Sequence, residues 1–92
     1  MSYQSVFPDF DDAASCERLL ALGFADTSYS NDACPSFERD GIAIYIDYAN
    51  PSLSEMPTSD GFRFTLINPD TGNSDQFDCL ERTIRHHIQW LA

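Results

Sequence analysis

The feature that most constrains this chain is a β-hairpin signal near its centre. The pair Asp40-Gly41 favours a type I′ turn, because both central positions of that turn need a positive φ. Such a turn pairs Phe37 with Ile44. Apolar and other side chains alternate after the turn, as in a strand with one buried face. The buried face takes Ile42, Ile44, Ile46 and Tyr48, and the outer face takes Ala43, Tyr45 and Asp47.

A second strand is predicted between residues 61 and 67, where the same alternation returns before the turn-forming segment 68–73. Its inner residues are Phe62, Phe64 and Leu66, and its outer residues are Arg63, Thr65 and Ile67. A further short strand is expected within residues 24–29. The loop of residues 50–60 is long for a compact domain, and loops of that length often carry function.

Two amphipathic helices flank these strands. The first is expected over residues 12–22, with Asp12 near its N-cap and Gly23 as its left-handed C-cap residue. Its apolar stripe is Cys16, Leu19 and Leu20. The second runs over about residues 77–91, and its stripe is Phe77, Leu80, Ile84, Ile88 and Leu91.

These elements predict one α+β domain over residues 1–92, since the chain is too short for two cores. The expected architecture is an antiparallel sheet of three to four strands with the N-terminal and C-terminal helices packed on one face. The other face would be mixed in polarity and would carry Tyr45. Either it is an exposed surface for a partner, or the 50–60 loop or the N-terminal segment covers it.

The charge balance excludes several classes of function. Fifteen acidic residues face five arginines and no lysine, giving a net charge of −10. Direct binding to nucleic acid or to anionic lipid needs a basic surface, so neither is expected. No apolar run is long enough for a membrane-spanning helix, and the N-terminus has no secretory signal. We therefore expect a cytoplasmic protein.

The residue types that carry chemistry do not fall into a catalytic or metal-binding pattern. His86 and His87 are adjacent, so on a helix they point about 100° apart and cannot share an ion. Cys79 lies too far along the same helix to pair with either histidine. An odd number of cysteines indicates reduced thiols, with Cys16 and Cys79 in core or boundary positions and Cys34 the most exposed. We expect no enzyme activity, no cofactor and no metal.

The remaining signal is the acidic surface itself. Most of the carboxylates are short aspartates in turns and at helix starts, where a stiff scaffold can hold them like an array of phosphates. A basic protein surface built for nucleic acid would recognise such an array. The alternative is that the acidity serves only solubility. The candidate partner-binding residues are Asp9, Asp11, Asp12, Tyr45, Asp47, Asp70, Asp75, Asp78 and Glu81.

In length, charge and α+β organisation the chain resembles small phage-encoded anti-defence proteins, above all the anti-CRISPR class. The resemblance is carried by the acidic segment 9–12, the Asp40-Gly41 hairpin and segment 70–81. It lies in the profile and not in a motif, so no functional residue is transferred. It implies a non-enzymatic inhibitor, present in the host cytoplasm, that blocks a subunit of a CRISPR effector or another nucleic-acid-binding protein, as a nucleic-acid mimic does.

Two other functions fit the same features. An immunity protein or antitoxin would neutralise a basic toxin through the same negative field. A homodimeric adaptor would instead use the outer sheet face, or the flank of the last helix. The predicted oligomeric state is accordingly monomer or homodimer. The helix flank comprises Cys79, Thr83, His86 and Trp90, for which packing against the rest of the fold is the favoured interpretation.

Overall fold

The computed structural model describes residues 2–53 and 62–91 and confirms the α+β class. In chain order the elements are α1 (Tyr3–Val6), α2 (Ala13–Ala21), β1 (Ala25–Asp26), β2 (Ser36–Arg39), β3 (Ile42–Ile46), the 3₁₀ turn η1 (Pro51–Leu53), β4 (Phe64–Ile67), β5 (Ser74–Phe77) and α3 (Leu80–Leu91). Most of the 50–60 loop, from residue 54 onward, lies outside the described residues.

The described strands form one antiparallel sheet in the order β1-β2-β3-β4-β5. There are five of them in the described part of the chain, so the prediction of three to four strands was too low. The strand missed by the pattern is β5, because Phe77 was expected in the last helix and the residues just before it were expected to lead into that helix. Asp75 pairs with Leu66 and Phe77 with Phe64. An edge strand forms through backbone hydrogen bonds to its neighbour, and this needs no alternation of side chains.

The predicted hairpin is confirmed in turn and register. Asp40 and Gly41 have φ values of 55° and 77°. Phe37 pairs with Ile44 as expected. The register therefore fixes which residues of β3 face the helices and which face away.

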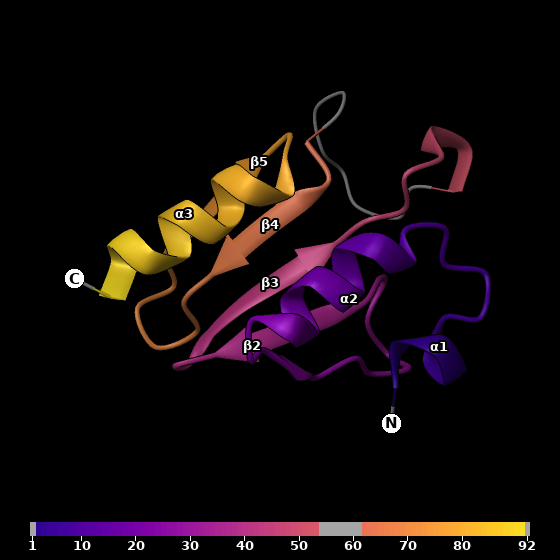
Figure 1. Cartoon of the computed structure of the whole chain (residues 1–92), viewed down its shortest axis with the longest axis horizontal. Coiled ribbons are helices and arrows are strands. Elements are labelled where there is room, and N and C mark those ends of the chain that lie inside the picture. Colours follow the sequence, from indigo (N-terminus) through magenta and orange to yellow (C-terminus); the bar gives the residue numbers. More distant parts are fainter. Residues whose placement is uncertain (1, 54–61, 92) are drawn as a thin grey trace.

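Both main helices lie on the same side of the sheet, α2 over β2 and α3 over β4 and β5 (Figure 1). The start of α2 is capped by Asp12, which accepts a hydrogen bond from the backbone N–H of Ser15 at 3.3 Å. Its end is closed by Gly23 at φ 88° and by the N–H of Phe24, which donates to the carbonyl of Leu19 at 3.0 Å. This arrangement is a Schellman motif.

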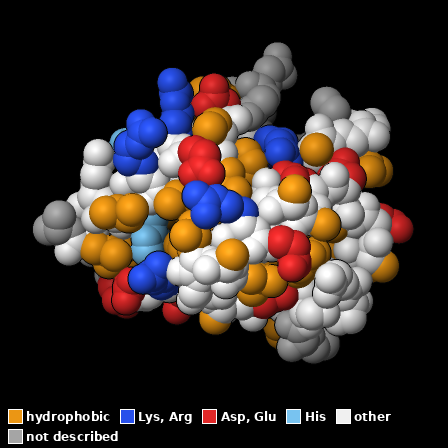
Figure 2. Space-filling model, viewed as in Figure 1, with side chains coloured by type: hydrophobic (Ala, Val, Ile, Leu, Met, Phe, Trp, Pro, Cys, Tyr) orange, Lys and Arg blue, Asp and Glu red, His pale blue; other side chains and the backbone are white. Residues whose placement is uncertain are grey.

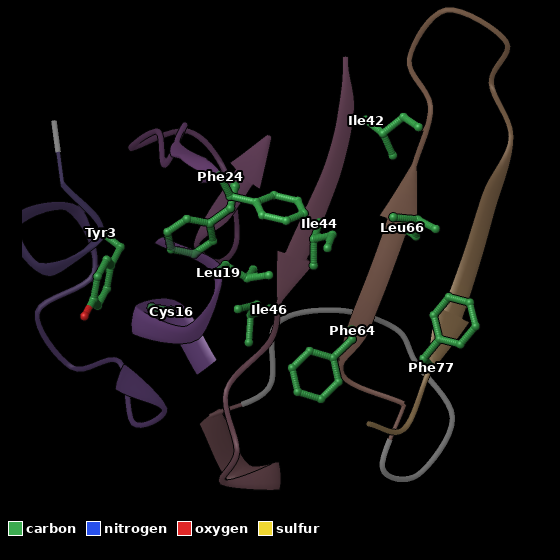
Figure 3. Close-up of a cluster of buried hydrophobic side chains, with 11 residues drawn as sticks. Tyr3, Cys16, Leu19, Phe24, Ile42, Ile44, Ile46, Phe64, Leu66 and Phe77 are labelled. Atoms are coloured by element: carbon green, nitrogen blue, oxygen red, sulfur yellow. The ribbon is translucent and has the colours of Figure 1, made fainter. Parts of the chain in front are cut away.

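The core lies between the sheet and the helices (Figure 3). Cys16 and Leu19 of α2 are fully buried, whereas Leu20 is 38% exposed and was wrongly placed on the buried stripe. Because Cys16 and Leu19 point at the sheet, Leu20, one position further along the helix, points away from it. The buried apolar cluster comprises Tyr3, Cys16, Leu19, Phe24, Phe37, Ile42, Ile44, Ile46, Phe64, Leu66 and Phe77.

Helix α3 is rotated relative to the predicted stripe. Ile88 and Leu91, expected in the core, are 63% and 48% exposed. The buried residues are Thr83 and His87 instead. His87 places Nε2 2.9 Å from the carbonyl oxygen of Arg39 and its ring 4.8 Å from that of Phe24. A polar side chain that finds both a hydrogen bond and a ring contact can occupy a core position without large cost.

Candidate functional site

Most acidic side chains of the cluster before α2 form bonds within the protein that stabilise the fold. Asp9 is exposed in the turn after α1. Asp11 accepts backbone N–H bonds from Ala49 and Asn50, both at 2.8 Å, and so fixes the chain where it leaves β3. Asp12 receives the guanidinium of Arg63 at 2.8 Å. Of the three predicted contact residues here, only Asp9 has no such bond in the described part of the chain.

Asp12 joins the helix cap to the sheet. Its Oδ2 accepts the hydroxyl of Ser15 at 2.6 Å as well as Nη2 of Arg63. Burial would raise the pKa of Asp12, but the hydrogen bonds from Ser15 and Arg63 outweigh that effect and hold the pKa below its ordinary value. The ionised carboxylate is thus stabilised inside the fold and does not project toward a partner.

The second acidic group does not form one patch with the first. Asp70 belongs to the β4–β5 turn and Asp75 to β5, and both are exposed. Asp78 pairs with Arg82 at 3.4 Å, and Glu81 pairs with Arg18 of α2 at 3.1 Å. The β4–β5 turn and the segment between α1 and α2 lie at opposite ends of a molecule that is 35 Å long (Figure 1).

The helical face mixes charges of both signs. Figure 2 looks onto this face and shows basic, acidic and apolar side chains beside one another. Each of four arginines lies within 4.0 Å of a carboxylate among the described residues, and two of these pairs join separate elements. The pairs are Arg18–Glu81, Arg39–Asp40, Arg63–Asp12 and Arg82–Asp78. This face therefore does not present an uninterrupted array of negative charge.

The outer face of the sheet is different. Tyr45 stands there in the middle of β3, with Ser36 opposite it on β2 and Thr65 on β4. Its ring is partly exposed, and burial together with the nearby Asp32, Cys34 and Glu38 raises the pKa of Tyr45. Two carboxylates, Asp32 and Glu38, thus act electrostatically on an aromatic side chain of this face.

Asp47 lies on the same face but is not a surface group, contrary to the prediction. It is only 1% exposed. Its backbone N–H donates to the carbonyl of Arg63 at 2.8 Å, so the β3–β4 pairing continues past the end of β3. Its Oδ1 accepts the N–H of Tyr48 at 2.8 Å.

The N-terminal segment does not cover the outer face. Tyr3 packs with its ring 5.9 Å from that of Phe37, which belongs to the helix side of the sheet. Its N–H donates to Asp26 at 2.7 Å and its hydroxyl to Glu17 at 2.9 Å. Two segments were expected as possible covers of the outer face. The N-terminal segment is therefore excluded, and the 50–60 loop lies mainly outside the described residues.

Two of the three thiols occupy different positions from those expected. Cys34 is fully buried, and Cys79 is exposed, which reverses the prediction for this pair. The cause is the carbonyl of Pro35, which accepts the N–H of Ile46 at 3.0 Å and extends the β2–β3 pairing back toward Cys34. His86 stacks on Phe77 with ring centres 4.6 Å apart. Among the described residues, no group of three or more His, Cys, Asp or Glu side chains could hold a metal ion.

Two carboxylates that act on Tyr45 were missed as candidates. Glu38 follows Phe37, so the hairpin register alone places it on the outer side. Asp32 lies in the β1–β2 connection, and no local pattern brings that segment near Tyr45. Thr65 was correctly assigned to the outer face by alternation, but its role was not recognised.

Comparison with protein-family models, with curated proteins and with solved structures finds no match to this chain. Within the described residues, no helix has both the length and the apolar character needed to cross a bilayer.

Proposed function

We propose that this protein is a non-catalytic inhibitor that binds a basic surface of a nucleic-acid-handling complex, as the anti-CRISPR proteins that it resembles do. The supporting observation is how charge divides between the two sides of the sheet. Arg18, Arg82 and Arg85 belong to the helices, and Arg39 donates to the carbonyl of Leu22 at the end of α2. These cations all lie on the helical side.

By register Arg63 belongs to the outer side, but its guanidinium reaches Asp12 at the start of α2, so its charge is engaged on the helical side. Arg63 binds Asp12 at 2.8 Å and the carbonyl of Asp47 at 3.0 Å. Asp32 and Glu38, by contrast, have no ion pair within the described chain. Two carboxylates that act on Tyr45 are therefore without an arginine partner in the described part of the chain. A basic partner would be steered toward this face, since opposite fields accelerate association.

The test is competition between this protein and nucleic acid. Purified CRISPR effector complexes of several types are each titrated with the protein, and binding of target DNA is followed by fluorescence anisotropy. A basic nuclease toxin in the same panel tests the antitoxin alternative. We expect loss of DNA binding in at least one effector at a 1:1 ratio. If only the toxin is neutralised, the antitoxin function replaces the proposed one, and if no panel member responds to a large excess, both are rejected.

A matched pair of variants locates the contact. Asp32→Asn with Glu38→Gln removes two negative charges from the outer face and should weaken inhibition about tenfold. Asp9→Asn with Asp70→Asn removes the same charge at exposed sites elsewhere and should have a much smaller effect. Equal losses for the two variants would mean that total charge, and not the outer face, determines binding.

A further inference from the structure

Tyr45 has a setting suited to a cation. Its ring stands on the outer face between β2 and β4, and it remains partly exposed. Ser36 is the cross-strand partner of Tyr45. Glu38 lies two residues further along β2, on the same side of the sheet. Burial raises the pKa of Tyr45, and the charges of Asp32, in the β1–β2 connection, and of Glu38 raise it further. An aromatic ring flanked by two carboxylates attracts a positive group both to its face and to its edge.

Thr65 supplies an independent observation. It faces Tyr45 directly across the β3–β4 pair and is 5% exposed. Its Oγ1 is buried without a hydrogen-bond partner. A buried hydroxyl left unsatisfied destabilises a fold, and valine would fill the same space without that cost. The isolated domain therefore gives no reason for a hydroxyl at this position.

We propose that the outer face at Tyr45 accepts an arginine side chain of the partner, with the guanidinium stacked on the Tyr45 ring and hydrogen-bonded to Asp32 and Glu38. A shift of the Tyr45 ring on binding brings an N–H of the guanidinium to Oγ1 of Thr65. This inference rests on the proposed function and names the group recognised. Arginine is specified over lysine because its planar fork both stacks and donates several hydrogen bonds at once.

The test uses two synthetic probes of equal charge, an octa-arginine and an octa-lysine peptide. Affinity is measured by calorimetry, and the contact is mapped by amide chemical-shift changes. We expect the arginine peptide to bind about fivefold more tightly, with the largest shifts at Tyr45, Thr65 and Glu38. Tyr45→Leu should abolish that preference, whereas Tyr45→Phe should keep it.

Thr65→Val separates a binding role from a structural one. We expect its thermal midpoint to equal or exceed that of the unmodified protein, while its affinity for octa-arginine falls and its affinity for octa-lysine does not. An unchanged affinity for octa-arginine would remove Thr65 from the site. Circular dichroism on each variant verifies that it is folded.

The outcomes distinguish this inference from the function on which it rests. Equal binding of the two peptides, or a preference that survives Tyr45→Leu, overturns the arginine site but leaves electrostatic binding intact. Amide chemical-shift changes confined to the helical face would contradict the placement of both the arginine site and the electrostatic contact on the outer face. Failure of both peptides to bind at low salt contradicts the proposed function itself.

Discussion

At the scale of residues, several aspartates of this chain serve mainly to hold the fold together. Asp11 accepts the backbone N–H groups of Ala49 and Asn50, and Asp12 accepts that of Ser15. Asp26 accepts the backbone N–H groups of Tyr3 and Ser28. A short carboxylate reaches nearby backbone donors in turns and at helix starts, which is why aspartate is favoured there. The helix cap at Asp12 could be predicted from local sequence. Its partner Arg63 could not, because the two are 51 residues apart.

The Asp12–Arg63 pair should make stability depend on pH. Because the pKa of Asp12 is lowered on folding, its contribution is complete above the ordinary value of 3.8 and disappears as pH falls through the folded value. Asp12→Asn keeps a capping side chain but loses the charge, and should cost about 1 kcal/mol at neutral pH. Asp12→Ala loses the cap as well and should cost about 2 kcal/mol. Urea unfolding measures both, and a difference from wild type that persists unchanged in strong acid would contradict this account.

Thiol labelling tests the burial of the cysteines. Cys79 is exposed, whereas Cys16 and Cys34 are buried, and burial raises the pKa of Cys16 to about 12. Because the thiolate is the reactive form, iodoacetamide should modify Cys79 in the native protein and all the cysteines in urea. Mass spectrometry of the digest identifies the labelled site. Native labelling of Cys34 at the rate of Cys79 would contradict the burial of Cys34.

At the scale of elements, local signals determined some structures and not others. The Asp40-Gly41 turn and the Gly23 C-cap were predictable because each depends on positive φ, which few residue types tolerate. The rotation of α3 was not predictable. It depends on the carbonyl of Arg39 in β2 and on the ring of Phe24 after α2, which His87 contacts only in the folded chain. Strand β5 gave no signal for a similar reason, since its stability comes from pairing with β4.

A pair of substitutions on α3 tests that rotation. Ile88→Gln changes an exposed residue and should shift the free energy of unfolding by less than about 0.5 kcal/mol. His87→Ala removes a buried ring and leaves the Arg39 carbonyl without its partner, so it should cost about 2 kcal/mol or more. Urea unfolding of both variants gives the comparison. The reverse order of effects would support the stripe expected from periodicity alone.

At the scale of the whole molecule, the sheet separates two surfaces with different charge. The helical side shows basic and acidic side chains beside one another (Figure 2) and carries ion pairs between them. The outer side carries Tyr45, and the carboxylates that act on it have no ion pair in the described chain. Composition predicted the net charge, but it could not predict this division. That depends on the alternation of each strand and on which arginines reach across to a helix.

The same charge distribution predicts a monomer. Two copies of a chain with a net charge of −10 repel each other, and Asp75 places a charge on the edge strand β5, where sheets of two copies would otherwise pair. Light scattering at physiological salt should give 10.4 kDa. A stable species of twice that mass would favour the homodimeric adaptor and would require the outer face to be re-examined as its interface.

The most direct test of the central claim is the salt dependence of binding to the effector found by the competition assay. Calorimetric titrations over a range of sodium chloride concentrations give the slope of log Kd against log salt. If an acidic outer face binds a basic surface, affinity should fall about tenfold or more between about 50 and about 300 mM salt, because screening shortens the range of the field. An affinity that stays constant across that range would contradict electrostatic recognition and indicate an apolar interface.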